Sequence, residues 1–269
     1  MNSSTSTLTA RTLILTLIDS ARRETLSARY FVAAGELFGL DSTSVRVALG
    51  RLVKDGSLRQ RGRGVYELGS RSGTLHRLVR NWARVEASTK TWKGDWVGVF
   101  VAHLSRSNKT ALRGRERALR LFGFAEPQPG LWVRPDNLVL KQAELRSSLL
   151  ELGLDARALT YTISELAPTE AVRFTLWDRD GLEAQYRKNL TMLAESTERF
   201  EHLNEEDVGR ETLTLGRAVT RDILLDPLLP SEMVDIELRA KMVAAMRAYD
   251  RLGKDFWRRF EATHNARSK

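Results

Sequence analysis

The sequence predicts a mainly helical α+β protein with three parts: an N-terminal winged helix-turn-helix, a central ferredoxin-like domain and a C-terminal helical domain. Three observations predict this fold. Three stretches with helical spacing precede a basic hairpin, the central region alternates strand and helix patterns, and the chain beyond Thr175 is helical almost throughout. We place the winged helix at 1–70, a linker helix at 71–92, the ferredoxin-like domain at 93–175 and the helical domain at 176–269.

The N-terminal part contains three expected helices. The first covers Thr9–Ser20, and the second covers Ser27–Phe38 and ends at Gly39. The third follows Asp41, which is suited to the N-cap, and stops at Gly56, the residue best suited to the left-handed position after a helix. The helix order is that of a helix-turn-helix domain.

A basic hairpin is expected directly after the third helix. Two short strand-like runs, Ser57–Gln60 and Val65–Leu68, flank the sequence Arg-Gly-Arg-Gly at 61–64. Three helices followed by such a hairpin are the plan of a winged helix.

The central and C-terminal parts continue with further expected elements. We expect strands at Trp96–Leu104, Leu131–Arg134 and Arg157–Ser164, helices at Lys109–Phe122 and Asn137–Leu152, and one more short strand near Phe124. Strand and helix alternate here, as in a ferredoxin-like layer. The C-terminal helices are expected at Gly181–Leu203, Glu211–Leu224 and Ser231–Phe260.

Composition excludes several classes of protein. The chain has no cysteine, so disulfides, thiolate catalysis and zinc-cysteine sites are excluded. No apolar run approaches the roughly 20 residues that span a bilayer, and the N-terminus lacks the pattern of a signal peptide. We therefore expect a cytoplasmic protein without membrane association.

Positive charge is concentrated at the N-terminus. Residues 1–84 hold 14 Lys and Arg against 6 Asp and Glu, a net charge of +8 out of +9 for the whole chain. A basic domain joined to a near-neutral remainder is typical of a nucleic-acid-binding protein.

The third helix and the hairpin supply the candidate DNA contacts. On the exposed helix face, Arg46 can reach guanine in the major groove, and the hydroxyls at the first turn can bond phosphate or base edges. The candidate residues are Ser42, Thr43, Ser44, Arg46, Val47, Arg51, Arg61 and Arg63. A run of basic residues is usually just a solvent-exposed face. Here, however, the apolar spacing of the helix, its N-cap, the glycine at its end and the hairpin after it all favour a DNA-binding domain. RNA-binding glycine-arginine segments are a second alternative, although these are usually repeated or disordered.

Catalytic and metal-binding patterns are not found. The four histidines have no His or carboxylate partner at metal-ligand spacing, and there is no phosphate-binding loop or nucleophile elbow. We expect neither catalysis nor a cofactor. The alternative is a metal-dependent nuclease on the central layer, but Asp95 stands at the wrong end of the first expected strand for that chemistry.

Four segments, in this order, resemble the PaaX family of bacterial transcriptional repressors, over nearly the full length of the chain. They are FVAAGELFGLDSTSVRVALGRLVKDGSL, WKGDWVGVFV, LRLFGFAEPQPGLWVRPDN and DILLDPLLPSE. The resemblance implies a dimer with a winged helix, a ferredoxin-like domain similar to the CRISPR-associated protein Cas2, and a helical C-terminal region. It also places the recognition helix at Ser42–Lys54 and the wing at Leu58–Leu68.

The family's function gives the expected activity. PaaX-like proteins repress catabolic operons, such as those of aromatic catabolism, and an acyl-CoA releases them from the operator. For this chain the resemblance implies a homodimer on an inverted-repeat operator in double-stranded DNA, with a small acyl-CoA or aromatic-acid-derived effector. The candidate effector contacts are Arg113, Arg117, Trp132 and Arg134, which supply positive charge and an aromatic surface.

Overall fold

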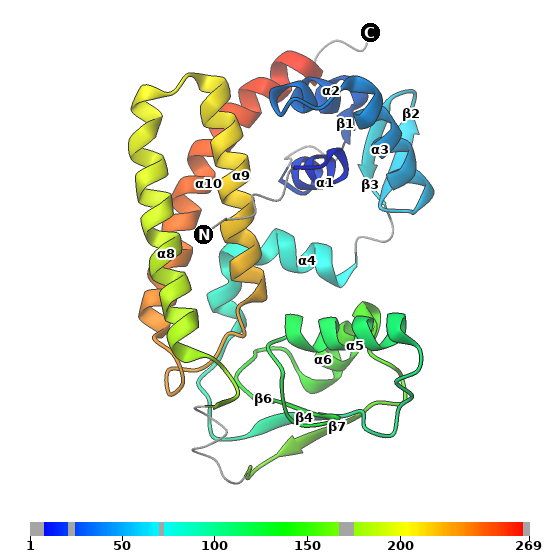
Figure 1. The fold of residues 1–269 in the computed structure, drawn as a ribbon, viewed down its shortest axis with the longest axis vertical. Coiled ribbons are helices and arrows are strands. Elements are labelled where there is room, and N and C mark those ends of the chain that lie inside the picture. The colour runs from blue at the N-terminus through cyan, green and yellow to red at the C-terminus, as the bar shows by residue number, and fades with distance from the viewer. Residues whose placement is uncertain (1–7, 21–24, 70–72, 167–174, 266–269) are drawn as a thin grey trace. The chain divides into compact units, whose positions relative to one another are not determined.

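Figure 1 shows the computed structural model of the protein, which describes residues 8–20, 25–69, 73–166 and 175–265. The described residues form a mainly helical structure with two small antiparallel sheets, which confirms the predicted α+β class. No helix within these ranges is long and apolar enough to cross a membrane.

The described structure divides into two compact units, each of which combines segments that are separate in the sequence. The N-terminal unit holds residues 1–80, 193–218 and 247–269, and the central unit holds residues 81–192 and 219–246. The helices expected in a C-terminal domain at 176–269 contribute residues to both units.

The N-terminal unit begins with three helices and a three-stranded sheet. These elements are α1 (Ala10–Ser20), β1 (Thr25–Ser27), α2 (Ala28–Leu37), α3 (Ser42–Lys54), β2 (Leu58–Gly62) and β3 (Val65–Leu68). The sheet has the order β1-β3-β2, and both pairs are antiparallel. The expected hairpin is confirmed, whereas β1 was not expected, because three residues carry no periodic pattern.

Local caps explain where these helices begin and end. Ser27 accepts a hydrogen bond from the backbone N–H of Tyr30 at 3.1 Å and caps α2. Asp41 caps α3 as predicted, by accepting from the N–H of Ser44 at 2.8 Å. Gly39 and Gly56 follow the two helices with φ of +68° and +76°, which glycine adopts without strain.

The core of the N-terminal unit joins both ends of the sequence. Most of its fully buried side chains come from α1, α2 and α3, and Leu26 of β1 and Leu58 of β2 join them. Leu213, Trp257 and Phe260, from the C-terminal helices, pack against the same core. The rings of Tyr30 and Phe260 meet edge to face at 5.9 Å. The N-terminal domain is thus completed by residues far away in the sequence.

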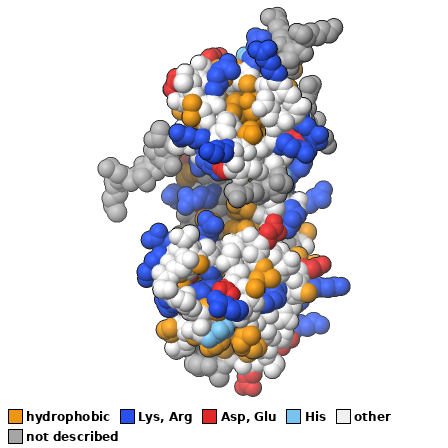
Figure 2. All heavy atoms as spheres, turned by 90° about the vertical axis from the view of Figure 1, so that its right-hand side faces the viewer, with side chains coloured by type: hydrophobic (Ala, Val, Ile, Leu, Met, Phe, Trp, Pro, Cys, Tyr) orange, Lys and Arg blue, Asp and Glu red, His pale blue; other side chains and the backbone are white. Residues whose placement is uncertain are grey.

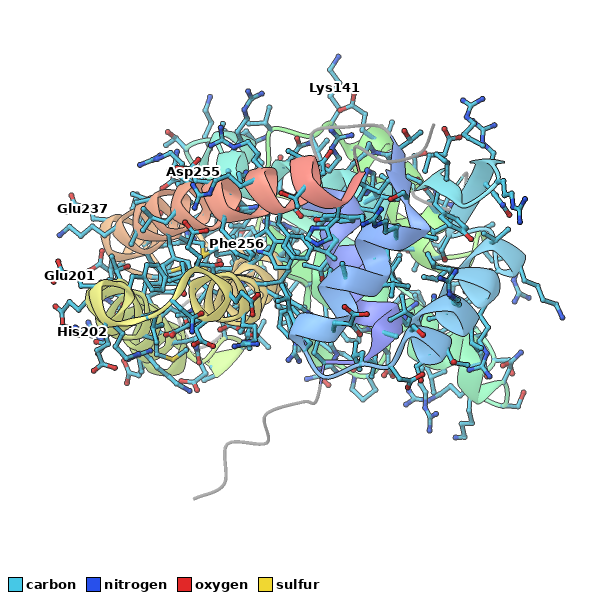
Figure 3. The ribbon with its side chains drawn as sticks, turned by 90° about the horizontal axis from the view of Figure 1, so that it is seen from above. Lys141, Glu201, His202, Glu237, Asp255 and Phe256 are labelled. Carbon is cyan, nitrogen blue, oxygen red and sulfur yellow. The ribbon has the colours of Figure 1, made fainter. Side chains whose placement is uncertain are left out.

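The C-terminal helices α8 (Arg179–Arg199), α9 (Glu205–Leu225) and α10 (Ile236–Asn265) are long, and η2 (Phe200–His202) links the first two. Within the N-terminal unit α9 and α10 approach closely, because Gly209 leaves room for the ring of Phe256, which points from α10 toward α9 in Figure 3. Ser196 donates to or accepts from Tyr249 at 2.6 Å, which adds a buried polar contact between α8 and α10.

The central unit is built on a four-stranded antiparallel sheet with the order β5-β6-β4-β7. Its strands are β4 (Trp96–Phe100), β5 (Ala125–Gln128), β6 (Leu131–Pro135) and β7 (Leu159–Ile163). Helices α5 (Lys109–Leu121) and α6 (Gln142–Leu152) cover one face of this sheet, as Figure 1 shows. The chain enters the unit through α4 (Thr74–Asn81) and η1 (Trp82–Ser88), where a linker helix was predicted.

A buried polar network fixes the connection between α9 and α10 within the central unit. Asp226 accepts from the hydroxyl of Tyr186 at 2.5 Å and from the N–H of Leu228 at 2.7 Å. Asn137 donates to the carbonyl of Leu228 at 2.7 Å. Leu228 has a φ of +53°, which a non-glycine residue rarely adopts. These bonds hold the connection against the end of β6.

Several expected boundaries were wrong. The helix expected from Asn137 starts at Gln142, because Asn137 is buried in the network just described. The first strand of the central sheet ends at Phe100 rather than Leu104. The helix α9 starts at Glu205 rather than Glu211, since Asn204 accepts from the N–H of Asp207 at 2.9 Å.

Candidate nucleic-acid interface

Helix α3 has one buried face and one exposed face. Val45, Leu49 and Leu52 are at most 1% exposed and hold the helix on the core. The outer face of α3 consists of the exposed residues Ser42, Thr43, Ser44, Arg46, Val47, Gly50, Arg51 and Lys54. Six of the eight predicted DNA contacts therefore lie together on this face.

The first turn of α3 is already occupied by a carboxylate. Ser44 donates both its N–H and its hydroxyl to Asp41, at 2.8 and 2.6 Å. These hydrogen bonds keep the pKa of Asp41 below its ordinary value. The N–H of Ser44, at the helix start where an anion is favoured, thus already faces Asp41. Ser42 and Thr43 remain as the exposed hydroxyls of this turn.

The middle of the outer face combines charge with an apolar side chain. Arg46 and Arg51 are exposed, and Val47 between them is 46% exposed, which is high for a valine. An arginine can bond guanine through two nitrogens, and an apolar side chain can contact the methyl group of thymine. The face can thus distinguish bases as well as attract phosphates.

The hairpin of β2 and β3 presents its arginines around one buried carboxylate. Glu67 is 8% exposed and accepts from Nε of Arg61 at 2.5 Å and from Nε of Arg59. These bonds lower the pKa of Glu67 and keep it charged. Because only Nε is used, the terminal guanidinium nitrogens of both arginines stay available to a ligand.

Arg63 stands at the tip of the hairpin. It is exposed, and Gly64 beside it has a φ of +71°, which the tight turn requires. The carbonyl of Gly64 accepts from the N–H of Ala28 at 2.7 Å, so the tip is held against the start of α2. Arg63 therefore extends from a fixed turn.

Figure 2 looks onto the side of the N-terminal unit that carries α3 and the hairpin. Lys and Arg side chains flank a central group of apolar side chains there. The sequence identified the helix residues and Arg61 and Arg63, but it missed Arg59 and Glu67. A signal for them was available in the sequence. Arg59 and Arg61 are two positions apart and so share one side of β2, and Glu67 faces Arg59 in the register of β2 and β3.

The four candidate effector residues do not form one site. Arg113 and Arg117 are exposed on α5, whereas Trp132 is buried in the sheet beneath Arg120. Arg134 is only 1% exposed. Its guanidinium donates to Asn137 at 2.8 Å and to the carbonyls of Pro135 and Phe122, and burial lowers its pKa to about 9. Arg134 has a structural role instead.

A cleft of about 410 Å³ does open in the central unit, beside the end of α5. Arg120, Phe124, Trp177, Gln185 and Leu225 are among its lining residues. Trp177 stacks on Trp96 with the ring centroids 6.3 Å apart, so one wall of the cleft is rigid. The cleft was not predicted, because the spacing of arginines and tryptophans along the sequence does not show that Arg120 and Trp177 lie together in the fold.

Comparisons with known proteins bear on the fold. No family model matches the chain, and no curated protein matches it. Among solved structures it is similar to the uncharacterized protein Rv0674 from Mycobacterium tuberculosis, with a TM-score of 0.65 and 24% identity over 94% of this chain and 99% of that one. At this identity the similarity concerns the fold alone.

Proposed function

We propose that the protein is a sequence-specific DNA-binding transcriptional regulator, a repressor of the PaaX type that acts as a homodimer on an inverted repeat. In this proposal α3 enters the major groove and the hairpin of β2 and β3 contacts the backbone or the minor groove. The family assignment and the repression of a catabolic operon are part of the same proposal.

The outer face of α3 carries the proposal. A helix whose inward side chains are completely buried holds its outward ones in a fixed direction. Here the outward ones include Arg46, Val47 and Arg51, none of which is needed for the core. Phosphate contacts from the basic N-terminal residues would add affinity that falls steeply with salt.

The topology supports the finer domain assignments. Three helices followed by a hairpin whose second strand also pairs with a short strand before α2 fit a winged helix. In the central unit the order β5-β6-β4-β7, with helices after β4 and β6, fits a ferredoxin-like domain. We propose both assignments on this basis.

For the effector we propose the cleft beside α5 rather than the four residues expected from the sequence. Its volume suits an aromatic or acyl group, and Arg120 supplies a positive charge at its edge. An acyl-CoA would then place only its acyl end inside. The cleft is lined by Gln185 of α8 and Leu225 of α9, helices that also contribute residues to the N-terminal unit.

No observation favours the nuclease alternative. Within the described residues, no group of three or more histidine, aspartate or glutamate side chains lies where it could hold a metal ion. We therefore keep a single proposed function.

The test is selection of duplexes from a random-sequence DNA library by the purified full-length protein. Fluorescence anisotropy then measures the affinity for a selected duplex, a scrambled duplex and single strands over a range of salt concentrations. We expect enrichment of an inverted repeat and an affinity that falls with salt. Failure to enrich any sequence, or equal binding to single strands, would overturn the proposal.

A further inference from the structure

Helix α5 carries a second concentration of positive charge, in the central unit. Its sequence holds five Lys and Arg against one Glu, a net charge of +4. Residues 85–269 together carry only +1, because residues 1–84 hold +8 of the +9 of the whole chain. Acidic residues elsewhere therefore offset the charge of α5 in the total, and only its position in the fold makes it visible.

Four of the five basic side chains form a single row along α5, called here the basic row. Its members are Lys109, Arg113, Arg117 and Arg120, and all four are exposed. Their spacing of four, four and three residues returns to the same helix face at each turn. At a rise of about 1.5 Å per residue, the basic row extends for about 16 Å along the helix axis.

The helix beneath the basic row is fixed in place. Asn108 caps α5 by accepting from the backbone N–H of Ala111 at 3.0 Å. On the inner side, Ala118 and Leu119 are at most 1% exposed and anchor the helix in the core of the unit. The guanidinium of Arg120 lies over the ring of Trp132, 5.4 Å from its centroid. The basic row therefore has a defined direction before any ligand binds.

The cations of the basic row lack the acidic partners found on other helices. On α8, Arg179 and Arg187 both bind Glu183, at 3.0 and 3.3 Å. On α10, Lys254 pairs with Asp250 one turn earlier. Within the described residues no carboxylate forms an ion pair with a member of the basic row. Like charges one turn apart destabilise a helix, and a bound polyanion would relieve this cost.

The length and composition of the basic row indicate the backbone of a duplex. A single phosphate ion is shorter than the row, whereas each strand of DNA presents one phosphate for roughly every 3.4 Å of helix axis. Proteins that bind single strands also stack aromatic side chains on the bases. However, α5 contains no aromatic residue, and Trp132 beneath it is only 2% exposed. Arginine and lysine alone are suited to phosphates.

We propose that the basic row of α5 is a second nucleic-acid contact, which binds the phosphate backbone of duplex DNA without regard to sequence. Charges directed at phosphates add affinity but do not read bases. The basic row therefore raises the affinity for every duplex by the same factor, while α3 supplies the discrimination. The inference rests on the proposed function for the choice of DNA as the polyanion, but it concerns a surface that the α3 interface does not use.

Fluorescence anisotropy of the full-length protein over a range of salt concentrations tests the contact, with the double variant Arg113→Ala/Arg117→Ala. Each lost phosphate contact lowers the slope of log affinity against log salt by roughly 0.9. We expect the slope to fall by about two and the affinity for selected and scrambled duplexes to fall equally, about tenfold at low salt. The ratio of the two affinities should stay unchanged.

The matched control is Arg179→Ala/Arg187→Ala, which removes the same charge from α8 in the same unit. These arginines are 50% and 61% exposed but bind Glu183. The control should keep the slope of the unsubstituted protein. Thermal unfolding by circular dichroism verifies that both double variants fold. Equal slopes for the two variants would overturn the proposal, whatever other anion the basic row attracts.

A conservative pair separates charge from side-chain shape. Arg113→Lys/Arg117→Lys keeps both charges, and lysine binds phosphate as a point charge. It should retain most of the affinity and of the salt dependence. A loss as large as that of the alanine pair would contradict a contact made through charge.

Cross-linking tests whether the basic row itself touches DNA. Since the chain has no cysteine, Arg113→Cys can carry a photoactivated cross-linker on a single thiol. It should cross-link to selected and scrambled duplexes alike. Tyr161→Cys is the control, because Tyr161 is 42% exposed and the register of β7, β4 and β6 places it on the opposite face of the sheet from Trp132. Equal cross-linking from both positions would contradict the contact.

These measurements keep the two proposals apart. If duplexes are not discriminated but the alanine pair on α5 still lowers the slope, the proposed function fails and this inference stands. If discrimination is observed but that pair behaves like the control on α8, only this inference fails.

Discussion

At the scale of single residues, Glu67 sets how much positive charge the hairpin presents. It is shared by Arg59 and Arg61 and cancels one of their two charges, while Arg63 at the tip has its full charge. A carboxylate inside a basic surface reduces attraction to phosphate but fixes the directions of the arginines. The hairpin therefore combines orientation with moderate charge.

Replacing Glu67 tests this balance. Glu67→Gln removes one negative charge from the proposed DNA surface and leaves the side-chain shape almost unchanged. We expect tighter binding to every duplex sequence and a salt dependence steeper by about one counterion, measured by anisotropy. Arg63→Ala should have the opposite effect on both quantities. Unchanged salt dependence in both variants would exclude the hairpin from the interface.

Asp55 links the stability of the N-terminal unit to pH. Its hydrogen bonds with Ser57 and with Arg11, the latter at 2.7 Å, lower its pKa from 3.8 to about 2. Because the pKa is lower in the folded state, the stabilisation is complete above about pH 4 and is lost as the pH falls toward 2. Asp55→Asn should flatten this part of the curve of unfolding free energy against pH.

Chemical denaturation from about pH 5 down to about pH 2 measures the effect. Glu206→Gln is the control, because Glu206 is exposed at the start of α9 in the same unit. It should keep the pH dependence of the unsubstituted protein. The assignment fails if Asp55→Asn and the unsubstituted protein lose stability in parallel.

At the scale of elements, the contact between α9 and α10 completes the core on which α1, α2 and α3 rest. An added Cβ at Gly209 would lie 2.1 Å from the ring of Phe256, and one at Gly253 would lie 2.9 Å from Thr212. Glycine at these positions lets two long helices approach, although it costs helix propensity. The N-terminal unit depends on that approach.

Gly209→Val should therefore destabilise the N-terminal unit by about 1–3 kcal/mol, because the ring of Phe256 must move. Gly50→Ala is a matched control in α3, where an added Cβ meets nothing within 4 Å. It should be neutral or stabilising by up to about 1 kcal/mol. Equal unfolding midpoints for the two variants in urea would contradict the contact.

Elements with local signals were predictable, whereas those formed by distant contacts were not. The bounds of α3 follow from Asp41 and Gly56, which act within a few residues. The strand β1 exists because it pairs with β3, some 40 positions later, and no local pattern indicates it. Similarly, Asn137 has the sequence context of a helix start but is held by the carbonyl of Leu228. The outer face of α3, by contrast, was predictable, because it follows from the local helical spacing between Asp41 and Gly56.

At the scale of the whole molecule, the basic residues and the cleft belong to different units that share helices. Residues 1–84, of which 1–80 belong to the N-terminal unit, carry a net charge of +8, and the cleft lies among α5, α8 and α9 of the central unit. Both α8 and α9 contribute residues to the N-terminal unit. A ligand that moves either helix would therefore also move residues of the N-terminal unit. In the proposed regulator, binding of the effector and of DNA would be coupled through these helices.

The central claim is that the outer face of α3 selects the DNA sequence. The most direct test is how well the Arg46→Ala variant distinguishes a selected duplex from a scrambled one. The ratio of affinities for selected and scrambled duplexes is measured for this variant and for Arg251→Ala, an exposed arginine of α10 in the same unit. We predict a loss of discrimination of roughly 10- to 100-fold for Arg46→Ala and no change for Arg251→Ala. Full discrimination retained by Arg46→Ala would contradict the account.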